Sequence, residues 1–328
     1  MKKIRFATIG TNFIVQWFLE AAQHCEAFEW AAAYSRNLET GQVFTAGTSG
    51  VCIYDSLADL ASAPDIDAVY IASPTCCHAE QAIQMLESGK HVLCEKPAAS
   101  NLAEWKLMTA AAARSGRIVL EAMRPLYAPG FQTIKEHLSE LGTIRRASFN
   151  FCQYSSRYDK YKNGVIENAF RPEMSNGALM DIGIYCVESM IGLFGKPLQV
   201  QGASYILDGS IDAMGSICAG YDGMHANIQY SKISDSTWGG EIQGESGTLI
   251  YEGISTPHHI KVRNRAGSVR TVFEDAPEHD IKYELQAFIE MICGSLSSEQ
   301  YHTVTIQSLE LADTVRKQCG IWFPADGI

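Results

Sequence analysis

A lysine just past a short apolar run is the first residue whose position suggests chemistry. Lys96 follows the predicted strand His91–Cys94, and Pro97 fixes the turn behind it. At the mouth of a ligand pocket, partial desolvation and a nearby positive charge would both lower the pKa of its ammonium. The group could then donate a hydrogen bond, or move a proton, at a substrate oxygen. The alternative is an ordinary surface lysine beside a turn.

A second cluster lies in the middle of the chain, in the run Asn176–Tyr185. On a helix, Asp181 and Tyr185 are four residues apart and share one face. A carboxylate can hold a hydroxyl group, and a phenol next to an ammonium can act as acid and base. Gly183 would let another backbone or a ligand come close. The alternative is a capping aspartate and an amphipathic tyrosine at the surface.

The turn after the first predicted strand resembles a nucleotide-binding turn. Gly10 suits the tight turn that such a fold needs before a helix N-terminus aimed at a pyrophosphate. The second and third glycine positions of the fingerprint are Asn12 and Val15, and asparagine is the best substitute where a positive φ is needed. An ordinary strand-to-helix turn is the alternative.

The end of the second predicted strand indicates which nucleotide would fit. NAD-selective folds place Asp or Glu here to hold the ribose hydroxyls, but this chain has Ser35 and Arg36. A hydroxyl followed by a guanidinium suits a 2′-phosphate, because arginine binds phosphate bidentately. NADP is therefore preferred to NAD, the alternative being a solvated arginine at a helix start.

The elements that must position these residues alternate between strand and helix in the first third of the chain. Repeated strand–helix units with short links predict an α/β fold with a doubly wound parallel sheet. The expected strands are Lys3–Ile9, Trp30–Ser35, Val51–Tyr54, Ala68–Ala72, His91–Cys94 and Ile118–Ala122, and the expected helices are Phe13–Cys25, Leu38–Ala46, Leu57–Ala61, Cys77–Ser88 and Ala103–Ser115.

Beyond about residue 124 the strands become longer and alternate with polar residues. Turn signals such as Asp208-Gly209 and Asp222-Gly223 separate several of them, which predicts an open, mostly antiparallel sheet packed on helices in an α+β domain. Helices are expected at Gly130–Leu141, Met180–Phe194, Ile281–Ile292 and Ile306–Cys319. We therefore predict a nucleotide-binding domain over 1–123 and a substrate-binding and oligomerisation domain over 124–328.

Composition excludes several classes of protein. The 328 residues carry a net charge of −11 and are 46% hydrophobic, which argues against nucleic acid or an anionic membrane as a main partner. Neither a membrane span nor a signal peptide is recognisable, so a cytoplasmic protein is expected. The ten cysteines show no metal-binding spacing, and His258-His259 has no nearby third ligand. No metal site is predicted.

Together these runs resemble the Gfo/Idh/MocA oxidoreductases, the group of glucose–fructose oxidoreductase and inositol dehydrogenase. The resemblance spans essentially the whole chain. It rests on Ala68–Pro74 with His78, on Gly89–Pro97, on Gly177–Tyr185, and more loosely on Glu245–Thr248 and Glu284–Phe288. The chain departs from the family pattern at Asn12 and Val15 and in the shortened glycine run 175–177.

The resemblance implies an N-terminal Rossmann domain, a C-terminal domain with a large open sheet, and hydride transfer between NAD(P) and a hydroxyl or carbonyl carbon. Lys96 would be the central catalytic residue, Asp181 would orient the substrate, and Tyr185 would be the acid or base. A tyrosine there is similar to glucose–fructose oxidoreductase and the dimeric dihydrodiol dehydrogenases. The expected cofactor contacts are Gly10, Thr11, Asn12, Phe13, Ile14, Ser35, Arg36, Ser73, Pro74, Thr75, His78, Glu95 and Lys96.

The expected substrate is a sugar, a cyclitol or a related diol. Arg124 and Arg171 could contact cofactor or substrate, or form inter-domain ion pairs. Two other functions stay open: a non-catalytic NADP-binding redox sensor, and an enzyme that uses bound cofactor transiently during elimination or glycoside cleavage. An exposed apolar sheet face would be buried in a second subunit, which predicts a homodimer or a dimer of dimers.

Overall fold

The computed structural model describes residues 3–208, 211–275 and 278–327. The chain divides into two compact units. Unit 1 comprises Met1–Ala122 and His279–Thr303, and unit 2 comprises Met123–Glu278 and Val304–Ile328. The predicted turn at Asp208-Gly209 lies partly outside the described residues, since Gly209 is not among them.

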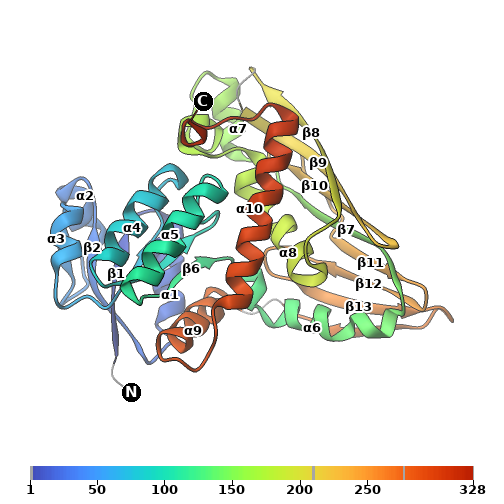
Figure 1. The fold of residues 1–328 in the computed structure, drawn as a ribbon, viewed down its shortest axis with the longest axis horizontal. Helices are drawn as coiled ribbons and strands as arrows, with labels where there is room; N and C mark the ends of the chain where they lie inside the picture. Colours follow the sequence, from blue (N-terminus) through green and yellow to red (C-terminus); the bar gives the residue numbers. More distant parts are fainter. Residues whose placement is uncertain (1–2, 209–210, 276–277, 328) are drawn as a thin grey trace. The chain divides into compact units, whose positions relative to one another are not determined.

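Unit 1 contains a parallel sheet of six strands in the order β3-β2-β1-β4-β5-β6. The strands are β1 (Ile4–Ile9), β2 (Phe28–Tyr34), β3 (Cys52–Tyr54), β4 (Ala68–Ile71), β5 (His91–Glu95) and β6 (Val119–Ala122). The helices between them are α1 (Phe13–Ala22), α2 (Leu38–Phe44), α3 (Leu57–Ser62), α4 (His78–Glu87) and α5 (Leu102–Ser115) (Figure 1). The predicted doubly wound sheet is confirmed, and its strand order reverses between β1 and β4, where such sheets bind ligands.

Helix α9 (Ile281–Ile292) belongs to unit 1, although the sequence analysis assigned it to the second domain. Phe288 of α9 is fully buried, and its ring centroid lies 6.0 Å from that of Phe6 in β1. His302 then donates from Nε2 to the Val119 carbonyl at 2.7 Å. This segment thus returns to the first sheet because its apolar face completes that core. Such a long-range return has no local signal in the sequence.

Unit 2 contains an eight-stranded sheet in the order β14-β13-β12-β11-β7-β10-β9-β8. Only β7 and β10 pair in parallel, so the predicted mostly antiparallel sheet is confirmed. Its strands are β7 (Ile144–Cys152), β8 (Gln199–Leu207), β9 (Ile211–Tyr221), β10 (Met224–Ser231), β11 (Gly240–Gly244), β12 (Gly247–Glu252), β13 (His258–Asn264) and β14 (Val269–Phe273).

Helices α6 (Pro129–His137) and α8 (Ile184–Phe194) lie along one face of this sheet, together with the later part of α10 (Glu299–Cys319) (Figure 1). Close packing of α10 needs Gly202, because a Cβ there would lie 2.5 Å from Val315. The short helix α7 (Ser156–Lys162) was not predicted, and none of its residues is buried, so it shows no apolar stripe.

The opposite face of the sheet differs from expectation. Strand pairing aligns one outward row across seven strands, and most of its side chains are polar: Gln201, Cys218, Asn227, Ser148, Glu241, Ile250 and Lys261. Tyr205 and Met214 are exposed apolar side chains on the same face. The prediction of an apolar outer face is therefore wrong. The alternation in these strands places the apolar residues inward, against the helices.

The stretch Pro172–Phe194 is apolar and long enough to cross a bilayer by length and composition, and 72% of its most apolar window is buried in the protein. The sequence analysis named no such stretch. Core helices pass the same test, and α8 at its end packs on β7 and β10.

Candidate active site

The loops after β1 and β4 meet at the carboxyl edge of the unit 1 sheet. Gly10 has φ 117°, and a Cβ on it would lie 2.8 Å from the Ala72 carbonyl oxygen. Both the conformation and the close approach therefore require glycine, as predicted for the tight turn. The crevice at this switch point is where dinucleotides bind in doubly wound sheets.

Asn12 has a different role from the one expected. Its φ is −85°, so no positive φ is needed at this position. Its side chain instead caps α1 by accepting from the Val15 N–H at 3.3 Å, and it donates to the Ala72 carbonyl at 2.8 Å. Val15, at the third fingerprint position, is fully buried. The departures from the glycine pattern are thus a helix cap and a core residue.

The turn fits a bound pyrophosphate. The first hydrogen-bonded N–H of α1 is that of Val15, so the N–H groups of Phe13 and Ile14 precede the ladder. Thr11 is half-buried in the same turn. Free N–H groups at a helix N-terminus attract anions. Phe13 and Trp17 are exposed here, with ring centroids 5.1 Å apart.

The end of β2 presents a basic side chain. Ser35 is buried, and its hydroxyl donates to the Asn37 carbonyl at 2.8 Å. Asn37 caps α2 by accepting from the Thr40 N–H at 2.9 Å. Arg36 between them is exposed. The local hydrogen bonds fix the backbone on both sides of the exposed Arg36.

The segment after β4 is held by hydrogen bonds inside unit 1. The Ser73 hydroxyl donates to Gln81 Oε1 at 2.6 Å. His78 is 1% exposed, and its two ring nitrogens lie 2.8 and 3.0 Å from the carbonyls of Ser73 and Pro97. Burial is the largest cause that lowers the pKa of His78, and the Lys96 charge lowers it further. The hydrogen bonds to backbone groups raise the pKa but do not cancel this effect. His78 therefore ties the loop after β4 to the loop after β5.

Hydrogen bonds to the Glu95 carboxylate position Lys96 at the end of β5. Both are half-buried, and Glu95 ends β5 beside the Pro97 turn. The Tyr70 hydroxyl donates to Glu95 Oε1 at 2.5 Å, and the Lys96 N–H donates to Glu95 Oε2 at 3.2 Å. Tyr70 stacks on Phe18 of α1, with centroids 3.8 Å apart. The Lys96 backbone is thus fixed through Glu95 to the core beneath the first turn. Pro74 and Thr75 open the adjoining turn.

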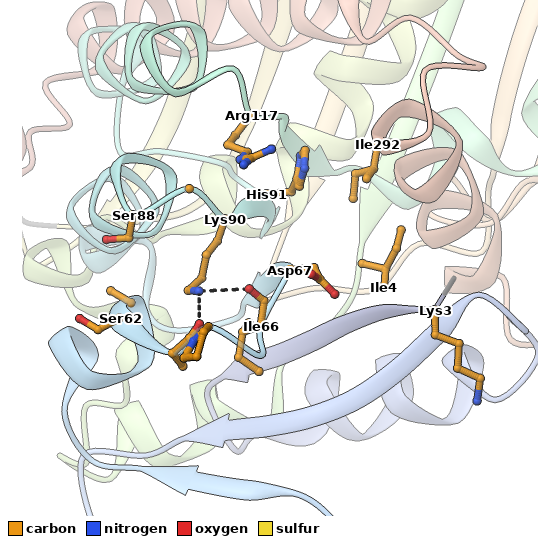
Figure 2. A pocket seen from close by; sticks show the side chains of 14 residues that line it. Lys3, Ile4, Ser62, Ile66, Asp67, Ser88, Lys90, His91, Arg117 and Ile292 are labelled. Atoms are coloured by element: carbon orange, nitrogen blue, oxygen red, sulfur yellow. Dashed lines mark hydrogen bonds between the residues drawn. The ribbon is translucent and has the colours of Figure 1, made fainter. Parts of the chain in front are cut away.

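The run Gly89-Lys90-His91 lies at the opposite edge of the same sheet, where the strands begin. Lys90 is 4% exposed and donates to the Ala63 and Ile66 carbonyls at 2.7 and 3.1 Å (Figure 2). His91 Nδ1 accepts from the Ile118 N–H at 3.0 Å, and burial lowers the pKa of His91 to about 4. These residues line a cavity of about 640 Å³ at the amino ends of the strands, so they hold loops together away from the switch point.

Asp181 and Tyr185 belong to unit 2. Asp181 lies in a π-helical turn, Leu179–Gly183, that precedes α8, and such turns occur frequently at functional sites. Tyr185 in the first turn of α8 is half-buried, with its ring centroid 5.6 Å from that of Phe151. Gly183 approaches the ring of Tyr230, since a Cβ there would lie 3.0 Å from it. The group that lies close to Gly183 is therefore the Tyr230 side chain, not a backbone segment or a ligand.

A buried lysine that sequence reasoning missed pairs with Asp181. Lys232 Nζ lies 2.6 Å from Asp181 Oδ2, and the Lys232 side chain is 3% exposed. Lys232 also donates to the Ala169 carbonyl at 3.2 Å and lies over the Phe170 ring at 5.0 Å. The ammonium stabilises the Asp181 carboxylate and fixes its direction. Lys232 follows β10, 51 residues away, so no local pattern links the two.

A buried carboxylate shapes the start of this helix. Asp212 of β9 is fully buried and accepts from the Leu179 N–H at 2.6 Å. Burial raises the pKa of Asp212 to about 6. Gly177 has φ 121°, and a Cβ on it would lie 2.0 Å from Asp212 Oδ1. The glycine in the motif is therefore required by Asp212, which sequence reasoning also missed.

The two predicted arginines lie in unit 2. Arg124 is half-buried at the start of a 3₁₀ turn, Arg124–Tyr127. Arg171 is exposed and donates from Nε to the Ile166 carbonyl at 2.9 Å. Of the three catalytic candidates, Lys96 lies in unit 1, whereas Asp181 and Tyr185 lie together in unit 2.

Two family models match this chain. The model described as an oxidoreductase family with an NAD-binding Rossmann fold matches residues 4–123. The model of the GFO/IDH/MocA C-terminal domain matches residues 131–250. The first match spans the whole unit 1 sheet, and the second spans β7 to β11 and most of β12 in the unit 2 sheet.

Curated relatives match over nearly the full length. The chain is 41% identical to the scyllo-inositol 2-dehydrogenase (NADP(+)) IolU of Bacillus subtilis over 98% of this chain and 99% of that protein. It is 27% identical to a trans-1,2-dihydrobenzene-1,2-diol dehydrogenase of Danio rerio, over 94% and 92% of the two chains.

Solved structures share the fold. A 3-ketoreductase from Actinomadura kijaniata, in complex with NADP and TDP-benzene, superposes with a TM-score of 0.86 over 97% of this chain and 98% of that one, at 22% identity. At this identity the likeness concerns the fold alone. The family models and the full-length relative establish that the chain belongs to the Gfo/Idh/MocA family of NAD(P)-dependent oxidoreductases.

Proposed function

We propose that this protein is an NADP-dependent dehydrogenase or reductase that acts on a secondary alcohol, or its ketone, of a cyclitol, a sugar or a related diol. The observation that carries the proposal is the full-length match, at 41% identity, to a protein named as an NADP-dependent scyllo-inositol dehydrogenase. The Lys96, Asp181 and Tyr185 set supports it, because a lysine, a carboxylate and a phenol provide proton handling and hydroxyl binding.

The preference for NADP is supported by the end of β2. Ser35 and Arg36 stand where an NAD-selective fold has an acidic residue, and Arg36 is exposed. A guanidinium there would pair with a 2′-phosphate. Titration of NADP and NAD into wild type and Arg36→Ala tests this. The variant should lose affinity for NADP selectively, and equal losses for both cofactors would contradict the assignment.

Bound NADP would supply the hydride acceptor, and its reduced form would supply the hydride donor in the reverse direction. In oxidation, we propose that Tyr185 takes the proton of the reacting hydroxyl while the Lys96 ammonium stabilises the phenolate that forms. Asp181 accepts a hydrogen bond from a substrate hydroxyl, and its carboxylate is oriented by Lys232 at 2.6 Å. In reduction, Tyr185 returns the proton.

The test is steady-state turnover of scyllo-inositol, myo-inositol, hexoses and a cyclic trans-diol with NADP, followed by the absorbance of reduced nicotinamide. Loss of a proton-transfer group typically slows turnover about 100- to 10,000-fold. Lys96→Met and Tyr185→Phe should fall in that range while NADP affinity stays within about threefold of wild type. Near-normal turnover in either variant would refute its role.

A double variant tests whether the two groups act together. If Lys96 and Tyr185 serve one proton transfer, Lys96→Met/Tyr185→Phe should be little slower than the slower single variant, because residues that act as a unit are non-additive. Multiplicative losses would mean that they act separately.

Neither alternative function has a specific structural observation in its favour. A sensor would not need an intact glycine fingerprint, but Asn12 and Val15, where the chain departs from it, serve here as a helix cap and a core residue. Transient redox chemistry would be indicated if the protein retained its cofactor and converted the substrate while the turnover assay showed no net reduction of NADP. Cofactor binding without any turnover would indicate a sensor.

We also propose a homo-oligomer, either a homodimer or a dimer of dimers. The exposed Tyr205 and Met214 on the outer sheet face support it, although most neighbours in that face are polar. An interface with a few aromatic or methionine side chains inside a polar rim is usual for subunit association. Sedimentation at micromolar concentration is the test, and a monomer would contradict the proposal.

A further inference from the structure

Two adjacent histidines and a glutamate converge at the turn between β12 and β13. Glu252 ends β12, and His258 begins β13. His259 Nδ1 lies 3.2 Å from Glu252 Oε2, and His258 Nε2 lies 3.9 Å from the same oxygen. The three donor atoms all lie within 4.8 Å of one another. Strand pairing thus supplies the third group that the sequence analysis could not find beside the two histidines.

The backbone here is built so that both imidazoles lie on one side. Neighbouring residues of a regular strand point to opposite faces. His259 has φ 46°, in the left-handed region, and the pairing of β12 with β13 shifts register between Ile250 and Glu252. The alternation is therefore interrupted, and the two imidazole centroids lie 4.8 Å apart. A histidine in this conformation is unusual and calls for a reason.

The His258 ring has the tautomer that a metal ligand needs. Its Nδ1 lies 2.8 Å from the Thr256 carbonyl, which can only accept, so Nδ1 carries the proton. Nε2 is then the ring nitrogen that faces Glu252. A histidine that binds a metal almost always donates its other N–H to a carboxylate or a backbone carbonyl in this way.

The loop beneath the ring is fitted to it. Gly253 has φ 65°, and a Cβ on it would lie 2.7 Å from His258 Cε1. Gly130 of α6 packs on the Pro257 carbonyl, where no Cβ could fit, and Ile254 is buried. The loop that carries His258 is therefore held from below, while the three donors remain accessible: the side chains of Glu252, His258 and His259 are 62%, 26% and 38% exposed.

We propose that Glu252, His258 and His259 form a binding site for a divalent transition-metal cation, with Zn²⁺ as the preferred ion. Two imidazoles and one carboxylate with open positions form a known Zn²⁺ donor set. Ligand atoms of a tetrahedral Zn²⁺ site lie about 3.3 Å apart, so the donors need move by only about 1 Å. The cation would bridge β12 to β13 and neutralise the Glu252 charge.

The experiment uses the full chain, treated with a chelator and then titrated with Zn²⁺ against a chromophoric chelator. Loss of a ligand should weaken the site by more than the roughly 10- to 100-fold that loss of a supporting group gives. The ligand variants are Glu252→Gln, His258→Asn and His259→Asn, since asparagine tolerates a positive φ. His225→Asn, in the exposed position of β10, is the matched control and should bind as wild type does.

A second variant tests the supporting geometry without removing a ligand. Gly253→Ala should displace the His258 ring and weaken Zn²⁺ binding about tenfold or more. Circular dichroism of each variant checks its fold. Because exposed cysteines such as Cys52, Cys218 and Cys293 also bind Zn²⁺, Co²⁺ serves as the spectroscopic probe. It should show ligand-field bands of nitrogen and oxygen ligation that disappear in His258→Asn.

Zn²⁺ binding that is equal in wild type and all ligand variants would overturn the proposal. Co²⁺ spectra with thiolate charge-transfer bands alone would overturn it as well, because they would place the ion on cysteines. The three side chains would then be held by the hydrogen bonds of His259 to Glu252 and of His258 to the Thr256 carbonyl, without a cation. The measurement is independent of turnover, so it does not depend on the proposed dehydrogenase function.

Discussion

Replacing Lys232 by methionine tests whether the buried pair with Asp181 organises the unit 2 half of the site. The change removes the ammonium and keeps the aliphatic volume. Asp181, whose side chain is 26% exposed, then loses the charged partner that lies 2.6 Å away. The Ala169 carbonyl also loses a donor. We expect both lower stability and poorer substrate binding.

The magnitude follows from the geometry of the pair. At 2.6 Å, two unit charges at an effective dielectric constant of about 20 attract by about 6 kcal/mol. Breaking a buried pair by removing one partner costs about 3–5 kcal/mol. Because water reaches one side of Asp181, we expect about 2–3 kcal/mol for Lys232→Met. Asp181→Asn should cost about 3–4 kcal/mol, since it leaves a lysine that is 3% exposed without its counter-charge.

The assay is a double-mutant cycle on the free energy of unfolding in urea, followed by circular dichroism and tryptophan fluorescence. Coincidence of the two transitions is the condition for using one free energy, because the chain has two units. Asp181→Asn/Lys232→Met should be less unstable than the sum of the single variants by about 2 kcal/mol. Additive losses would refute the pairing.

The same variant carries a kinetic signature. If Lys232 orients Asp181, Lys232→Met should raise KM for the polyol by about tenfold or more and leave NADP affinity unchanged. Lys232→Arg keeps the positive charge but replaces the ammonium with a larger planar guanidinium. The stability of this variant should therefore lie between those of wild type and Lys232→Met. An unchanged KM in Lys232→Met would mean that the pair has a structural role only.

Three further changes follow from the structure. The pKa of Asp212 in the folded chain is about 6, above its ordinary value of 3.8, so the stability that this group contributes is present at low pH and is lost as pH rises through about 6. Asp212→Asn should remove up to about 3 kcal/mol of that pH dependence, measured as unfolding free energy between pH 4 and 8. The pKa of His91 is lowered to about 4, so stability should fall as pH drops from 6.5 through 4, and His91→Gln should flatten this acid limb in thermal melts at each pH. Gly10→Ala places a Cβ 2.8 Å from the Ala72 carbonyl and should both destabilise unit 1 by about 1–3 kcal/mol and weaken NADP binding in calorimetry. Gly47→Ala, which also has a positive φ but meets no atom within 4 Å, is the control and should leave NADP affinity unchanged.

Local patterns in the sequence determined most of the elements. Strand alternation and helical spacing depend only on neighbouring residues, so β1 to β6 and α1 to α5 lie close to the predicted ranges, and the second sheet is mostly antiparallel as predicted. The same reasoning placed Gly10 in a tight turn and Lys96 beyond a strand. Such positions follow from chain order, because the carboxyl ends of parallel strands share one edge.

Tertiary structure alone decided which distant groups meet. Lys232 reaches Asp181, and Asp212 requires Gly177, because packing joins segments remote in the chain. Glu252 faces His258 because strand pairing closes one hairpin over them. Segment 279–303 joined unit 1 for the same reason, since its apolar side fits that core. A side chain's type and its local period fix which element it occupies. Its partner depends on long-range packing, which no window of sequence contains.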